Sequence, residues 1–147
     1  MVWKNWFRAL VALGLMLTLL APAGATLAAE TGGTGTLKAQ GQGTVKLIGD
    51  GAVYIGRGAG TVWVKNAAQI MTEGKGRRTV LRDGTVRLTG YTGAITLIGE
   101  GMEVTVVGGA IDLRAEGSGT ATLYGVGTYE TDIAQGEWSR QGAQVDY

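Results

Sequence analysis

The chain of 147 residues contains no cysteine, no histidine and a single proline. Without cysteine, no disulfide can brace the fold, and no thiol follows the leader for lipid attachment. Without histidine as well, the sequence excludes a Ser-His-Asp triad, a Cys-His pair and any metal site built from imidazole or thiolate. The side chains that remain for chemistry are carboxylates, lysines, hydroxyls and tyrosines.

The N-terminal segment has the parts of a secretory signal peptide. Lys4 and Arg8 give it a positive start, Ala9–Leu20 is an apolar run, and small residues follow. We expect cleavage after Ala25, with Ala28 as the alternative. The apolar run of about 12 residues is shorter than the ~20 that a spanning helix needs. The sequence therefore predicts an exported protein, periplasmic, on the cell surface or secreted, with no transmembrane span once mature.

Cleavage would also change the charge balance. The 13 basic residues would fall to 11 against 12 acidic ones, because Lys4 and Arg8 leave with residues 1–25. A nearly neutral protein has no strong general attraction to nucleic acid, so no nucleic-acid partner is expected. We divide the rest of the chain into a short linker (26–32), a repetitive β domain (33–128) and a C-terminal capping segment (129–147).

Glycine is abundant, with 27 residues, and it is regularly spaced. Gly-x-Gly or a related turn signal arrives every 7 to 10 residues, and the segments between alternate apolar and polar side chains. Such alternation between glycine turns is typical of short β-strands, so we predict an all-β domain. The apolar positions expected to face the core are Val45/Leu47, Val53/Ile55, Val62/Val64, Val86/Leu88, Ile95/Leu97, Val104/Val106, Ile111/Leu113 and Ala121/Leu123.

Equivalent apolar positions also recur at a longer spacing. Val45 precedes Val62 by 17 residues, and Val104 precedes Ala121 by the same number. This period favours a solenoid-like stack, a β-helix or β-roll, in which each coil packs on the next. An antiparallel meander folded into a β-sandwich is the alternative, because short glycine loops also suit hairpins.

The opposite side of the expected strands carries large apolar residues of its own. If these side chains point outward, they could bind a sugar or another chain. If the strands are covered on both sides, they are core residues. The candidate surface-binding residues are Tyr54, Trp63, Tyr124, Ile48 and Ile98.

Charged residues suggest two further kinds of site. Lys75, Arg77, Arg78 and Arg82, followed by Arg87, form a basic concentration that could bind an anion or could be a solvated loop. A third interpretation is a hydrolase that uses paired carboxylates, for which the neighbouring acids are Glu100 with Glu103 and Glu130 with Asp132.

No cofactor or metal is expected. The Gly-x-Gly turns run into expected strands, whereas a phosphate-binding loop requires a following helix. Only Asp50 and Asp83 stand at glycine turns in a way that suits calcium, and no repeated calcium signature is present. We therefore predict no catalytic, cofactor-binding or metal-binding residues.

The repeats themselves carry a resemblance. Gly33–Leu37, Gly41–Leu47, Gly58–Val64 and Gly117–Leu123 share the pattern G-x-G-T-[VL] or close variants, with one Gly-Ser-Gly. In this the chain resembles small glycine-rich exported bacterial β-proteins and, more loosely, the head domains of autotransporter adhesins, which are short-strand β-helices. The resemblance implies a non-enzymatic role outside the cytoplasm and transfers no functional residues.

The function expected first is that of an exported, non-enzymatic β-protein. It would act through its surface, by cell-envelope association, adhesion or self-assembly, with itself or an envelope polysaccharide as its partner. A carbohydrate-binding module is the alternative, and the carboxylate hydrolase is the third.

Overall fold

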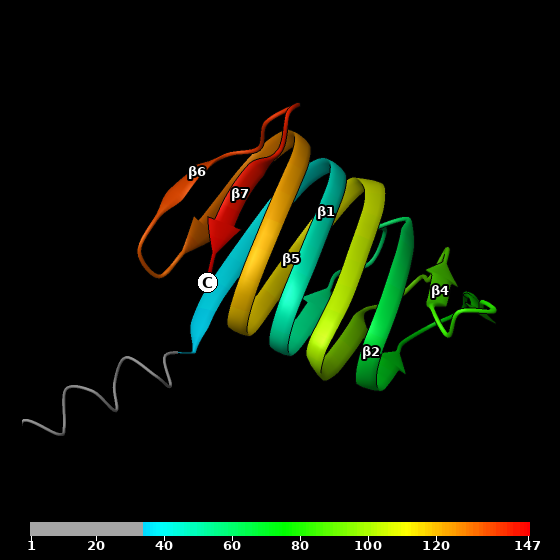
Figure 1. Ribbon diagram of the computed structural model, residues 1–147. Coiled ribbons are helices and arrows are strands. Elements are labelled where there is room, and N and C mark those ends of the chain that lie inside the picture. Colours follow the sequence, from blue (N-terminus) through cyan, green and yellow to red (C-terminus); the bar gives the residue numbers. More distant parts are fainter. Residues whose placement is uncertain (1–33) are drawn as a thin grey trace, which may run out of the picture. The chain divides into compact units, whose positions relative to one another are not determined.

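The computed structural model describes residues 34–147, which form an all-β domain (Figure 1). All strands belong to one seven-stranded sheet, with the main order β1-β5-β2-β4-β3, while β6 and β7 pair with β5. Every pairing between these strands is antiparallel. The strands are β1 (Gly35–Ile55), β2 (Thr61–Thr72), β3 (Arg77–Val80), β4 (Val86–Thr89), β5 (Ile95–Thr131), β6 (Gln135–Glu137) and β7 (Ala143–Asp146).

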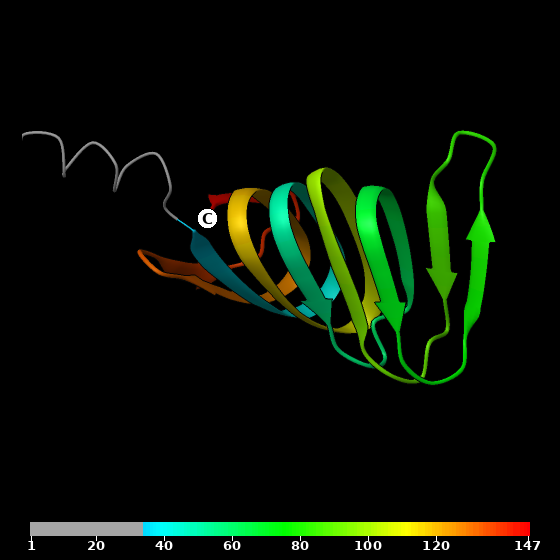
Figure 2. The ribbon, with the colours of Figure 1, turned by 90° about the horizontal axis from the view of Figure 1, so that it is seen from below.

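Strand β1 lies between two segments of β5. Leu47 pairs with Val104 on one side and with Ala121 on the other, and Val45 pairs with Val106 and Leu123. The two β5 partners of each residue are 17 positions apart, which is the period seen in the sequence. Figure 2 shows these passes of β5 and β1 side by side, followed by β2. The 17-residue spacing therefore marks two antiparallel neighbours of one strand.

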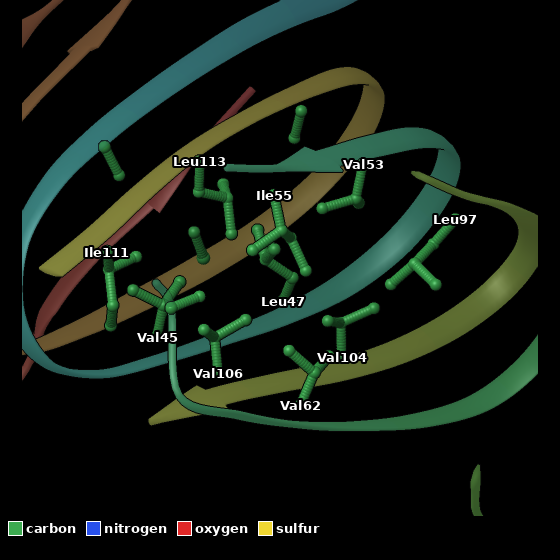
Figure 3. Close-up of a cluster of buried hydrophobic side chains, with 14 of the residues drawn as sticks. Val45, Leu47, Val53, Ile55, Val62, Leu97, Val104, Val106, Ile111 and Leu113 are labelled. Carbon is green, nitrogen blue, oxygen red and sulfur yellow. The ribbon is translucent and has the colours of Figure 1, made fainter. Parts of the chain in front are cut away.

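The core consists of the alternating side chains that the sequence predicts. Every predicted core position is buried except Val86, which is half-buried against the cluster. Figure 3 shows several of these side chains, among them Leu47 of β1, Val62 of β2 and Val104 of β5, pointing toward one another. Because strand residues alternate between faces, each buried pair leaves the intervening residue outside.

The prediction of short strands ending at each Gly-x-Gly turn is wrong for β1 and β5, which are 21 and 37 residues long. Several glycine pairs lie inside these strands. Gly43 pairs with Gly125 and has a φ of 137°, and a Cβ on it would collide with the carbonyl oxygen of Tyr124. Glycine is needed here because it accepts this φ and lets the neighbouring backbone approach closely. The ladder continues through such positions instead of ending there.

The pairing also distinguishes the two predicted architectures in part. The antiparallel pairing expected for a meander is present, but the strands form one sheet, whereas a sandwich has two. A meander would also pair consecutive strands, while here β1 pairs with β5 and β2 pairs with β4 and β5. The all-β prediction is confirmed. Within residues 34–147 there is no helix with the length and apolarity that a membrane crossing requires.

The C-terminal segment pairs along β5. The indole of Trp138, which is buried, donates a hydrogen bond from Nε1 to the carbonyl oxygen of Thr128 at 3.0 Å. Asp132 accepts hydrogen bonds from the backbone N–H and the hydroxyl of Thr36, at 2.9 and 2.6 Å. These bonds join the segment after β5 to the first residues of β1. The predicted leader (residues 1–25) and linker (26–32) lie outside the described residues.

Candidate functional site

The candidate surface residues lie in two separate groups of outward side chains along the sheet. We call the outward side chains in register with Thr44, Lys46 and Ile48 of β1 the Trp63 face. Those in register with Ala52 and Tyr54 form the Tyr54 face. Gly49 and Gly51 separate the two sets along β1, and both glycines pair with glycines of β5. The five candidates therefore do not form one continuous aromatic ladder.

The Tyr54 face carries Tyr54 and Ile98, which are 40% and 36% exposed. Tyr54 pairs with Thr96 and Arg114, and Ile98 pairs with Ala52. Ile98 also lines an open hollow of about 650 Å³. The hollow is further lined by Asp50, Gly51, Asn66, Ala67, Ala68, Gly99 and Glu100. The hollow thus contains Ile98, a candidate surface-binding residue, and Glu100, a carboxylate considered for catalysis.

On the Trp63 face, Trp63 is half-buried in the middle of a row that crosses the strands. It pairs with Arg87 of β4 and with Thr105 of β5. Thr105 in turn pairs with Lys46 of β1, and Lys46 pairs with Thr122 of β5. We call this set, Arg87-Trp63-Thr105-Lys46-Thr122, the Trp63 row. Its members come from β4, β2, β1 and two segments of β5.

A hollow of about 310 Å³ lies beside Trp63. The turn between β3 and β4 forms one wall of it, and outward residues of β2 and β5 form the rest. The hollow therefore combines an aromatic ring with charged side chains, as ligand pockets commonly do. Its lining residues are Trp63, Lys65, Leu81, Asp83, Thr85, Glu103 and Thr105.

Asp83 is held in place at the rim of this hollow. Its carboxylate accepts the backbone N–H of Thr85 at 3.0 Å and the Thr85 hydroxyl at 2.9 Å, and Lys65 lies 3.6 Å away. The backbone hydrogen bond from Thr85, then its hydroxyl bond and the charge of Lys65, lower the pKa of Asp83 below its usual range. Asp83 is therefore ionised at neutral pH, with Lys65 as its counter-charge.

Ile48 of β1 and Tyr124 of β5 are the other two candidates on the Trp63 face, and both lie nearer to β7 than Trp63 does. Ile48 is 60% exposed. Tyr124 is half-buried, and the ammonium nitrogen of Lys46 lies 5.7 Å from the centroid of its ring. That distance is within the range of a cation–π contact. Tyr124 pairs with Thr44, so β1 and β5 stand between it and Trp63.

The basic residues expected in a loop are distributed differently. Arg77 and Arg78 belong to β3, the last strand of the sheet, which pairs with β4 alone. Only Lys75 and Arg82 lie in connecting segments, and all four side chains are exposed. The four residues therefore do not lie in one loop, because the chain forms a strand at Arg77–Val80. Their role in anion binding stays a prediction. Figure 2 shows this end of the sheet, with β3 and β4 beyond β2.

The carboxylates considered for catalysis are all exposed. Glu103 faces outward opposite Lys65 and Ile48, and Glu130 opposite Lys38 and Gln135. Asp132 is engaged by Thr36, whose hydroxyl bond and then backbone bond lower the pKa of this carboxyl. Within residues 34–147 no group of three or more His, Cys, Asp or Glu side chains could hold a metal ion.

A third hollow, larger than the two described above, contains none of the predicted site residues. It is an open groove of about 970 Å³. Four of its fourteen lining residues are glycines, and its charged members, Arg57, Glu73 and Asp112, come from three separate segments. The side chains other than glycine are Gln40, Gln42, Arg57, Glu73, Thr92, Ala94, Ala110, Ile111, Asp112 and Val126.

The sequence indicates Trp63 as a candidate but does not place it beside the charged residues that surround it. Lys65, Asp83 and Glu103 line its hollow, and Lys46 shares its row. The 17-residue step from Lys46 to Trp63 was a usable signal, since both occupy the same outward position relative to β5. Arg87 and Asp83 carried no such signal, because their place depends on the antiparallel return of β4.

Comparisons with protein families, curated proteins and solved structures found no significant match.

Proposed function

We propose that this protein is exported and acts as a non-enzymatic surface protein, through cell-envelope association, adhesion or self-assembly. The observation that supports this most directly is the exposure of large apolar side chains on both outward faces. Ile48 and Val107 are 60% and 40% exposed, and Tyr54 and Ile98 are 40% and 36% exposed. Large apolar side chains exposed on a sheet are suited to contact another surface.

A solenoid-like stack is part of the same proposal. The support is the double pairing of β1, in which residues 17 apart in β5 flank the same β1 residue. The close approach of glycines such as Gly43 and Gly125 is a second support, as are the successive passes of ribbon in Figure 1. Such a stack would place the outward residues of successive strands side by side, at the strand spacing of about 4.8 Å. It would therefore present extended faces rather than a single deep pocket.

Two measurements on the protein purified after export test the proposed function. Light scattering after size-exclusion chromatography, over a wide concentration range, reports self-association. Co-sedimentation with isolated cell-envelope fragments reports envelope binding. We expect self-association, envelope binding or both. Replacing Tyr54 and Ile98 together by serine, or Ile48 and Val107 together by serine, should reduce the observed interaction. A protein that is monomeric throughout and remains in the supernatant would refute the proposal. Mass spectrometry of the same preparation would show whether cleavage follows Ala25 or Ala28.

Carbohydrate binding is the second candidate, and one observation favours it. Trp63 is the only tryptophan or tyrosine of residues 34–147 that lines the hollow formed with the β3–β4 turn. Aromatic rings present an apolar face against which a pyranose ring can stack. Tyr54 and Tyr124, the other aromatic candidates, stand outside this hollow.

A further inference from the structure

We propose that the Trp63 row binds an acidic polysaccharide, one that carries carboxylates, as a chain lying across the strands. This inference rests on the surface-acting function proposed above and on its carbohydrate-binding form. It adds the class of ligand, the residues that recognise it and the direction in which it lies.

The order of side chains in the Trp63 row carries the argument. The aromatic ring of Trp63 stands between two cations, with Arg87 on the adjacent strand and Lys46 two strands away. At the usual strand spacing, these steps are about 5 Å and about 10 Å. A sugar ring stacked on Trp63 would thus have a positive charge within reach on both sides along the row.

The two cations of the row have no acidic partner. Among residues 34–147, neither the guanidinium of Arg87 nor the ammonium of Lys46 lies in an ion pair. Arg87 can bind a carboxylate through two parallel N–H bonds, which favours a planar acidic group. The hydroxyls of Thr105 and Thr122 alternate with the larger side chains and can bond to sugar hydroxyls.

The acids near the row are partly compensated. Asp83 has Lys65 and Thr85 as partners, and Glu103 stands opposite Lys65 in the ladder. Glu103 nevertheless lies two residues from Thr105 on the same side of β5 and has no ion pair within the described residues. It should therefore repel an acidic chain and weaken its binding, which provides a test with the opposite sign.

The Tyr54 face provides a matched control. On the Tyr54 face, Tyr54 also pairs with an arginine, Arg114, and Lys38 lies one strand further on. Arg114 is already in contact with Glu116, however, and Glu130 stands opposite Lys38. The two faces thus contain similar residues, but only in the Trp63 row do both cations, Arg87 and Lys46, lack an acidic partner.

The test is calorimetric titration of the protein, purified after export, with oligogalacturonate and with the same oligomer as its methyl ester. The ester keeps the sugar backbone and removes the charge. We expect the acid to bind at least about tenfold more tightly, because hydrogen bonds to charged groups are lost in the ester. Binding should weaken as ionic strength rises from about 0.05 to 0.5 M. Equal affinity for acid and ester, or no binding of the acid, would overturn the proposal.

Variants place the site. Arg87→Gln, Lys46→Gln and Trp63→Ala should each weaken oligogalacturonate binding by about tenfold, and Glu103→Gln should tighten it about twofold. Arg114→Gln and Lys38→Gln should leave it unchanged. Equal losses on both faces would refute the site. If Trp63→Ala does not fold, Trp63→Tyr keeps an aromatic platform and should bind, while Lys46→Gln alone still decides the role of the row.

A parallel co-sedimentation with envelope fragments separates the two proposals. If Lys46→Gln and Arg87→Gln abolish co-sedimentation of the protein with the fragments, the Trp63 row is supported as the binding site. If neither change alters co-sedimentation, the Trp63 row is refuted as the binding site, while the proposed surface-acting function is still supported. Loss of retention for the unaltered protein, together with a strictly monomeric state, refutes the function itself and the row with it.

Discussion

Leu47 and Ile48 are neighbours in β1, yet the first is 2% exposed and the second 60% exposed. Both are aliphatic residues of similar size, and both have ladder partners on each side. Leu47 lies between Val104 and Ala121, whereas Ile48 lies between Glu103 and Thr120. The difference arises only from the alternation of side chains along the strand.

The two sides of the strand therefore have different roles. The inner side chains pack against one another and determine the stability of the domain. The outer side chains can be exchanged at little cost and are available for binding. This separation can be tested by substitutions that should change stability, function or neither.

The largest effect is expected for Leu47→Ala. It removes a fully buried side chain and leaves a cavity between β1 and both segments of β5, so the free energy of unfolding should fall by about 3–4 kcal/mol. Ile48→Ala next to it should change this energy by less than about 0.5 kcal/mol. Urea unfolding followed by circular dichroism measures both. Similar losses at the two positions would contradict the division into an inner and an outer side.

A somewhat smaller loss in the free energy of unfolding is expected for Gly43→Ala. This change tests the close contact between the backbone of β1 at Gly43 and that of β5 at Tyr124 and Gly125. Its Cβ would meet the carbonyl oxygen of Tyr124, and its φ of 137° is unfavourable for alanine. We expect a loss of about 2–3 kcal/mol. Gly84→Ala is the matched control, since its φ is also positive, at 83°, but its Cβ would meet open space. There the cost should be about 1 kcal/mol, from backbone strain alone.

A small, pH-dependent effect on stability is expected at the hydrogen bonds that join Asp132, just after β5, to Thr36 near the start of β1. Hydrogen bonds from Thr36 lower the pKa of Asp132 in the folded protein, so the charged carboxylate stabilises the fold. This contribution is present above the unfolded pKa of about 4 and is lost as the pH falls through the folded value. Asp132→Asn should lower the Tm at pH 7 and approach the parent protein in strong acid.

The control for this prediction is Glu130→Gln, two residues earlier. Glu130 faces outward, and no hydrogen bond from Thr36 reaches it. Its Tm difference should be smaller and should not follow the same pH course. Thermal melts between pH 2 and pH 7 would check both variants. An Asp132→Asn difference that grows toward low pH would contradict the assigned sign.

The smallest effect on stability is expected for serine at Tyr54 and Ile98 together. Both side chains are exposed, so the free energy of unfolding should change by less than about 0.5 kcal/mol per site. Self-association or envelope binding, measured by light scattering and co-sedimentation, should nevertheless fall. A loss of stability as large as that of Leu47→Ala would show that this face is covered by protein and is not a working surface.

The core could be predicted from the sequence because its signal is local. Two apolar residues separated by one outward residue, as at Val62 and Val64, indicate a strand and its buried side wherever the strand lies. The candidate Trp63 was found in the same way, as the residue between them. The glycines were the source of error, since Gly43 has the same sequence signature whether the chain turns back or continues past a close neighbour.

The sequence alone thus established an all-β domain, its buried positions and a 17-residue period, because these depend on the alternation of residues along one segment. The tertiary structure decided which segments are neighbours. The antiparallel return of β5 placed Val104 and Ala121 on either side of Leu47, and that of β4 placed Arg87 beside Trp63. Strand order and register depend on contacts between residues far apart in the chain, and such contacts leave no local pattern to read.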